Sequence, residues 1–144
     1  MDETNSDDIW FLDSGCNNHM TRNVAMFSAL DQNVKSQVTF GTDSKISVMG
    51  KREVKIFTKR GEKKTMADVY YVPRMKCNLL SIGQLVQKGY TVFFVDDVCT
   101  IMDKAPNKRC ISEVKMTRNR MFLLRMKENL KNGEGIAAVT QEAL

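Results

Sequence analysis

Apolar and polar residues alternate along the middle of the chain with a period of two, which is typical of half-buried β-strands. Glycine-containing turns interrupt the alternation at residues 41–44, at Gly50 and at residues 59–61. The apolar members of the pattern are Val38, Phe40, Ile46, Val48, Val54 and Ile56. The pattern predicts a meander of hairpins, then a strand over residues 66–72 that ends at Pro73 because proline lacks a backbone N–H.

A single helix is predicted, beginning at Ser81. Ser81 and Gln84 have the spacing of a capping box, and Gly89 supplies the left-handed residue that often ends a helix. The apolar face of this segment consists of Ile82, Leu85 and Val86. The helix is short, about two turns.

Two more hairpins are expected after the helix. The first spans residues 90–102 with Asp96 and Asp97 in its turn, and the second joins residues 110–116 to residues 121–126. From about residue 129 the β pattern ends, so we expect a flexible tail with at most a frayed helix. The chain of 144 residues is long enough for one substantial core, and the pattern predicts an all-β domain with one short helix.

The net charge of +5 is unevenly distributed. Residues 1–8 contain four acidic residues and no Lys or Arg, so the rest of the chain is basic. Lys and Arg alternate with apolar residues along the expected strands, which favours a solvated strand face over a nucleic-acid surface. Direct nucleic-acid binding through residues 51–64 and 104–131 is an open alternative.

Composition gives no indication of a membrane segment, a metal or a cofactor. No apolar run is long enough to cross a bilayer, and the acidic start differs from a signal peptide, so we expect a soluble cytoplasmic protein. The four cysteines lack the paired spacing of zinc sites and are interpreted as free thiols. His19 lies three residues after Cys16, but two ligands do not make a zinc site, and a catalytic thiolate pair would need further groups.

The apolar run of residues 9–12 leads directly into Asp13, Ser14 and Gly15, which predicts a buried strand that ends in an accessible carboxylate. Carboxylates hydrolyse peptides in pairs that share one proton: one activates water while the other protonates the carbonyl oxygen. An Asp-Ser-Gly or Asp-Thr-Gly triplet occurs once in the chain, so a twofold dimer would have to supply the second carboxylate. From spacing alone, an ordinary turn explains the triplet equally well.

Three separated motifs resemble one protein family. They are W-F-L-D-S-G-C-N-N-H-M at residues 10–20, D-V-Y-Y-V-P at residues 68–73 and N-L-L-S-I-G-Q-L at residues 78–85. In this order and spacing they resemble the retropepsin-like protease of copia-type LTR retrotransposon polyproteins, especially those of plants. The resemblance covers residues 9–103, and residues 119–124 resemble the start of the segment that precedes integrase.

The resemblance implies a closed β-barrel protomer that dimerises and cuts its own Gag-Pol polyprotein in a cytoplasmic virus-like particle, without a cofactor or metal. It implies four regions: an acidic flexible N-terminus at residues 1–8, the protease domain at residues 9–103, an additional hairpin at residues 104–128 that leads into the pre-integrase segment, and the tail at residues 129–144. The rival interpretation is a retropepsin-like binding or assembly module that lacks turnover.

The resemblance also assigns roles to residues. It makes Asp13 the catalytic carboxylate and Ser14 and Gly15 the support of the active-site loop. Residues 38–49 would be the flap that closes over substrate, with Phe40, Gly41, Thr42, Asp43 and Ser44 at its tip. Leu79, Leu80 and Ser81 would be the hydrophobic loop beneath the site.

Several residues are given structural roles. Most retropepsins have Gly at the position of Ser81, and many have Ser or Thr at the position of Asn17, so this sequence departs from the family pattern at both positions. His19 is expected to bond the loop backbone. Asp96 and Asp97 are expected to be solvated turn residues, as is Asp43, which is also placed to touch substrate from the flap.

Overall fold

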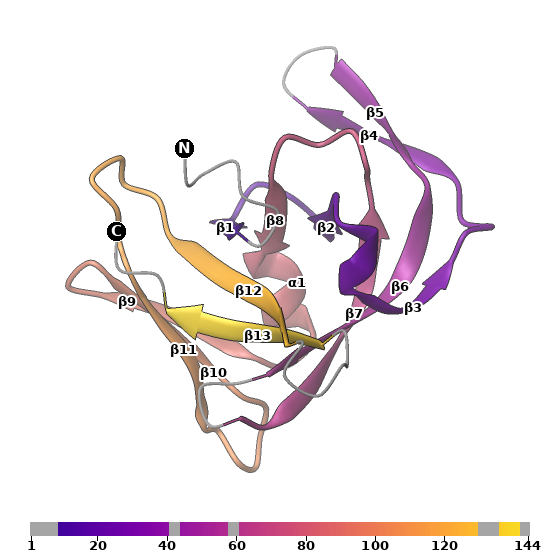
Figure 1. The fold of residues 1–144 in the computed structure, drawn as a ribbon. Coiled ribbons are helices and arrows are strands. Elements are labelled where there is room, and N and C mark those ends of the chain that lie inside the picture. Colours follow the sequence, from indigo (N-terminus) through magenta and orange to yellow (C-terminus); the bar gives the residue numbers. More distant parts are fainter. Residues whose placement is uncertain (1–8, 41–43, 58–60, 130–135, 142–144) are drawn as a thin grey trace.

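The computed structural model describes residues 9–40, 44–57, 61–129 and 136–141, which form β-strands and one short α-helix (Figure 1). The elements are β1 (Ile9–Asp13), β2 (His19–Thr21), the 3₁₀ turn η2 (Val24–Met26), β3 (Phe27–Asp31), β4 (Ser36–Phe40), β5 (Ser44–Val48), β6 (Gly50–Phe57), β7 (Lys63–Tyr71), β8 (Asn78–Ser81), α1 (Ile82–Gln87), β9 (Thr91–Val95), β10 (Val98–Met102), β11 (Cys110–Lys115), β12 (Leu123–Asn129) and β13 (Ile136–Gln141).

Eight strands form the main sheet, in the order β13-β12-β1-β8-β2-β7-β6-β3. Strand β1 lies inside it, parallel to β8 and antiparallel to β12. A further parallel pairing joins β13 to β6, so the sheet curls back on itself. The expected predominance of β-strands with one short helix is confirmed, whereas the closed retropepsin barrel stays a prediction.

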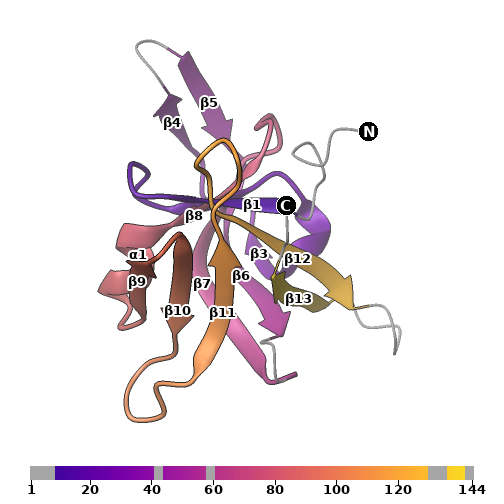
Figure 2. The ribbon, with the colours of Figure 1, turned by 90° about the vertical axis from the view of Figure 1, so that its left-hand side faces the viewer.

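Two small sheets complete the fold. Strands β9, β10 and β11 form an antiparallel sheet, and β4 and β5 form a separate hairpin. Figure 2 shows the β4–β5 hairpin at one end of the molecule and the β9–β11 sheet at the other. The hairpins predicted at residues 38–48 and 90–102 are confirmed by these pairings.

Strand β1 separates two hydrophobic clusters because successive side chains of a strand point to opposite faces. Trp10 and Leu12 pack with the larger cluster, which includes Leu80 and Leu124. Phe11 packs with the smaller one, whose buried members are Met20, Val48, Val72, Met75 and Leu79. The strand that ends at Asp13 is therefore anchored on both faces.

The predicted helix is present and begins as expected. Ser81 is its N-cap, with its side chain accepting from the Gln84 N–H, and the N–H of Gly89 bonds to Val86 at the other end. Its predicted apolar face is only partly correct: Leu85 is buried, whereas Val86 is 54% exposed.

The second predicted hairpin is wrong in its pairing. A turn does occur between Thr117 and Met121, but the strands then diverge, because β11 pairs with β10 and β12 pairs with β1. Burial explains this, since Leu123 and Leu124 are each 1% exposed beside β1.

The predicted tail also differs from the structure. Strand β13 occupies Ile136–Gln141, where a flexible tail with at most a frayed helix was expected, and it pairs with β12. The β-branched residues of this segment and the otherwise unpaired edge of β12 favour strand over helix. The acidic residues 1–8 lie outside the described residues.

Candidate active site

Asp13 is the last residue of β1, and it lies opposite Ser81 in the parallel pairing with β8. Its side chain is half-buried, whereas Ser14 and Gly15 are exposed. The Gly15 N–H donates to Asp13 Oδ1 at 2.7 Å. A Cβ on residue 15 would lie 3.2 Å from that oxygen, so glycine allows the loop to approach the carboxylate closely.

A cleft of about 550 Å³ lies next to this loop. One wall contains Asp13, Gly15 and the residues that follow them, and the other consists of residues 36–40 of β4. Met20 and Tyr70 also line the cleft. The Asp13 carboxyl group is therefore part of the lining of this cleft.

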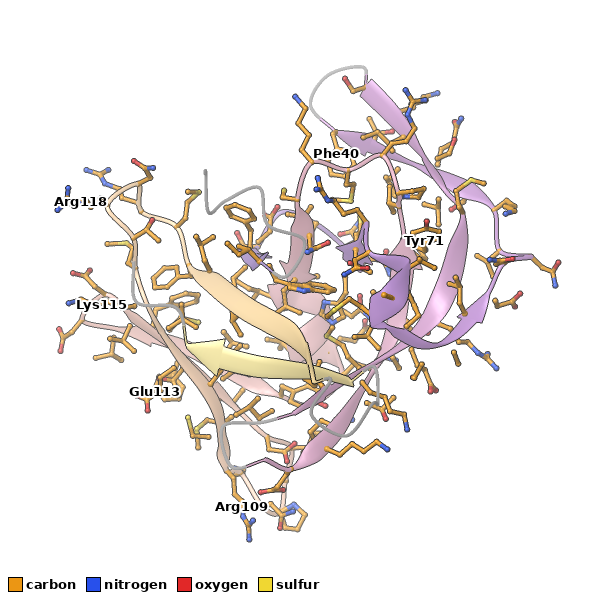
Figure 3. All side chains as sticks on the ribbon, viewed as in Figure 1. Phe40, Tyr71, Arg109, Glu113, Lys115 and Arg118 are labelled. Carbon is orange, nitrogen blue, oxygen red and sulfur yellow. The ribbon has the colours of Figure 1, made fainter. Side chains whose placement is uncertain are left out.

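The predicted flap coincides with the β4–β5 hairpin. Phe40 and Ser44 form its last described pair, and Figure 3 shows Phe40 at this end of β4. The predicted tip residues Gly41, Thr42 and Asp43 lie outside the described residues. The hairpin is thus present beside the cleft, and its closure over substrate stays a prediction.

The predicted hydrophobic loop is the strand β8, which lies alongside β1. Leu79 and Leu80 are paired with Phe11 and Leu12, and both leucines are buried. They contribute to the two different clusters, so β8 supports the aspartate strand on both faces.

Besides the predicted N-cap bond, Ser81 makes hydrogen bonds that the sequence did not predict. Its hydroxyl donates to the Cys16 carbonyl at 2.7 Å and accepts from the Gln84 N–H at 3.0 Å. Its backbone N–H donates to His19 Nδ1 at 3.0 Å. Ser81 is fully buried, and a hydroxyl at this position links the helix to the aspartate loop.

Gln84 does not complete the predicted capping box. Its Oε1 accepts from the His19 N–H at 2.8 Å, and its Nε2 donates to the carbonyls of Ala67 and Asp68, both at 3.1 Å. His19 makes the hydrogen bond that Gln84 would make in a capping box: its Nδ1 accepts from the N–H of the N-cap residue. The capping-box spacing was visible in the sequence, but this exchange of partners depends on β2 lying beside β8.

His19 is 2% exposed. Burial lowers its pKa from 6.5 to about 4; the negative charge of Asp68 partly opposes this effect, and the positive charge of Lys88 adds to it. The ring is therefore neutral at pH 7, and Nδ1 can accept a hydrogen bond. Its ring has a structural role, as expected, but the backbone group that it bonds is the Ser81 N–H at the end of β8 and not a group of its own loop.

Cys16 is a poor candidate for a nucleophile. Burial, and secondarily the negative charge of Asp13, raises the pKa of its thiol to about 11. A thiol with such a pKa stays protonated at pH 7, which argues against thiolate catalysis with His19. In the described ranges, no three His, Cys, Asp or Glu side chains are grouped so that they could hold a metal ion.

The remaining predicted residues are away from the cleft. Asp96 and Asp97 form the β9–β10 turn, with φ angles of 50° and 66°. Such positive φ values are typical of hairpin turns.

No helix in the part of the chain that the structure describes is both long enough and apolar enough to span a membrane.

Asn78 belongs to the third sequence motif, but the sequence did not predict the hydrogen bonds that it makes. It is fully buried at the start of β8; its Oδ1 accepts from Thr21 Oγ1 at 2.8 Å and from the Arg22 N–H at 3.0 Å. Its Nδ2 donates to the Ile9 carbonyl at 3.0 Å. It therefore ties together the starts of β1 and β8 and the end of β2.

We expect the Asn78→Ala variant to lose about 2 kcal/mol of unfolding free energy, because several buried polar groups would lose their partner. Urea unfolding followed by tryptophan fluorescence measures this loss. The matched control is Asn33→Ala, an exposed position whose replacement should change the stability by less than about 0.5 kcal/mol. Equal midpoints for the two variants would contradict the expected role of Asn78.

Comparison with protein families gives the class of the chain. It belongs to the family described as "Pol polyprotein, beta-barrel domain", whose model matches residues 10–90, more than half of the chain. The matched interval runs from β1 past α1, so it contains Asp13, the β4–β5 hairpin and Ser81. The predicted origin in a Pol polyprotein is confirmed at this level.

The chain is also similar to a curated transposon protein. The chain is 32% identical over 73 residues to a putative transposon Ty5-1 protein of Saccharomyces cerevisiae. The alignment covers 51% of this chain and 47% of that protein, so the chain spans about half the length of this relative. No solved structure matches the chain.

Proposed function

We propose that the chain is one protomer of an aspartic endopeptidase that matures the polyprotein of an LTR retrotransposon. The observation that carries the proposal is the position of Asp13, at the end of a buried strand and facing a cleft of about 550 Å³. Membership of the Pol polyprotein family and the likeness to the Ty5-1 protein support it. The family-like motifs make the copia-type retropepsin the specific class that we propose.

Catalysis then requires two protomers. Among the described residues that line the cleft, Asp13 is the one carboxylate. A single ionised carboxylate can take a proton from water but cannot also protonate the substrate carbonyl. A twofold axis that brings Asp13 beside its copy supplies a pair that shares one proton, since two close negative charges do not ionise together.

In this proposal each part of the site has its own task. Extended substrate lies along the cleft next to β4, where main-chain groups can bond to it and apolar side chains such as Val38 and Phe40 contact its side chains. The carboxylate pair activates a water molecule for attack on the peptide carbonyl. Closure of the β4–β5 hairpin excludes other water from the site.

We expect purified protein to cleave a quenched-fluorescence peptide with apolar residues on both sides of the cut, and pepstatin to inhibit this cleavage. Because the active species is a dimer, the rate should rise with about the square of protein concentration below the dimer dissociation constant and linearly above it. Molecular mass measured over the same concentrations provides the comparison. Absence of pepstatin-sensitive cleavage by a demonstrated dimer would instead support a non-catalytic assembly module.

A further inference from the structure

The Ser81 hydroxyl lies between the start of α1 and the loop that carries Asp13. The Gln84 N–H donates to it at 3.0 Å, and the Cys16 carbonyl is 2.7 Å from it. A serine hydroxyl has a single proton to donate. Since the Gln84 N–H is a donor and the carbonyl is an acceptor, that proton is directed at Cys16.

The backbone of Ser81 is attached to the other end of the same loop. Its N–H donates to His19 Nδ1 at 3.0 Å, and Asp13 is its register partner across β1 and β8. Ser81 thus contacts the segment between β1 and β2 at both Cys16 and His19. In the same segment, the Gly15 N–H bonds to the Asp13 carboxylate itself.

We propose that Ser81 is a positioning residue, whose hydroxyl fixes the Asp13 loop so that its carboxylate meets the second copy at the distance needed to share one proton. This inference rests on the proposed protease function. The hydroxyl does not touch the reacting groups; it acts through the Cys16 carbonyl, three residues from Asp13. The hydrogen bond from the Ser81 hydroxyl to the Cys16 carbonyl stands in place of the closer backbone packing that a glycine at this position would allow.

The test compares Ser81→Ala with the wild-type protein, by steady-state cleavage of the peptide that the wild type cuts fastest. We expect kcat to fall about tenfold, because a small displacement of a catalytic group is costly, while KM changes less than about twofold. The Ser81→Thr variant keeps the hydroxyl and should recover most of kcat. The assays are run well below the unfolding midpoint of each variant, since loss of the N-cap also lowers stability.

Ser112→Ala is the matched control. Ser112 is fully buried like Ser81 and lies on β11 in the small sheet, but its hydroxyl has no hydrogen-bond partner among the described residues. The control therefore also removes a buried hydroxyl oxygen, but one that makes no hydrogen bond to the loop that carries Asp13. Its kcat should equal that of the wild type.

A pH profile separates positioning from a loss of stability. When two carboxylates share a proton, their apparent pKa values lie far apart, and moving them apart in space brings the two values together. The bell-shaped dependence of kcat/KM on pH should therefore be narrower for Ser81→Ala than for wild type, and equally wide for Ser81→Thr and Ser112→Ala.

The outcomes are distinguishable. If the wild type cleaves with pepstatin sensitivity but Ser81→Ala keeps its kcat and profile width, the positioning role is wrong and the protease function stands. An inactive wild-type dimer overturns both. If Ser81→Ala does not fold, Ser81→Cys takes its place: a thiol is a much weaker donor than a hydroxyl, so kcat should still fall, and an unchanged kcat and pH profile overturn the proposal.

Discussion

The Asp13→Asn variant is expected to fold normally and to lose peptide cleavage by about 10⁴-fold, the upper range for removal of acid–base catalysis. An amide neither takes a proton from water nor shares one with its copy across the dimer axis. The fold should persist because the side-chain oxygen of Asn can still accept from the Gly15 N–H. Cleavage of the fluorescent peptide and the thermal midpoint are measured on the same preparation.

The control for this prediction is Asp97→Asn. Asp97 lies in the β9–β10 turn with a φ angle of 66°, a conformation that Asn adopts readily. The same chemical change at this position should leave cleavage intact. Undiminished cleavage by Asp13→Asn would refute the proposed protease, whatever the behaviour of the control.

The second large effect is a loss of stability in mild acid, caused by His19. Its pKa is about 4 in the folded protein and 6.5 for an ordinary histidine. Between these values the unfolded chain binds a proton that the folded protein excludes, so the stabilisation present above pH 6.5 is lost as the pH falls towards 4. The expected loss is about 3 kcal/mol of unfolding free energy.

His19 is well suited to this measurement because it is the single histidine of the chain. The carboxylates of Asp68 and Asp103, whose pKa values lie below the ordinary 3.8, affect stability only at lower pH. Urea unfolding at pH 7.5, 6, 5 and 4.5 should give a steady decrease in the wild type.

The His19→Asn variant is the control for the acid effect. Its side-chain oxygen can accept the Ser81 N–H but does not titrate, so its stability should be lower at pH 7.5 and nearly constant down to pH 4.5. A wild-type stability that does not change over this range, or a variant with the same slope, would show that the ring is not held neutral.

Much of the site could be predicted because its signals are local. The apolar run into Asp13 predicted the buried strand, and the spacing of Ser81 and Gln84 predicted the start of α1. Alternation predicted the β4–β5 hairpin. Each of these patterns depends on neighbours a few residues away, which a single sequence contains.

The remainder depends on contacts between distant segments. The partners of Asn78, Gln84 and His19 lie on β1, β2, β7 and β8, and which polar atoms meet follows from strand register rather than from residue type. For the same reason the alternating pattern predicted strands β11 and β12 but not that they pair with different sheets. A turn in the sequence indicates a chain reversal without specifying the neighbours of the strands that follow.

The position of β12 limits where a polyprotein containing this domain can be cut. Strand β12 covers the open edge of β1, with Leu124 opposite Trp10 and Leu123 opposite Phe11. A cut upstream of residue 123 would separate this strand from the segment that carries Asp13. Under the proposed function, the downstream cleavage site is therefore expected beyond β12, so that cutting the precursor leaves this strand paired with β1.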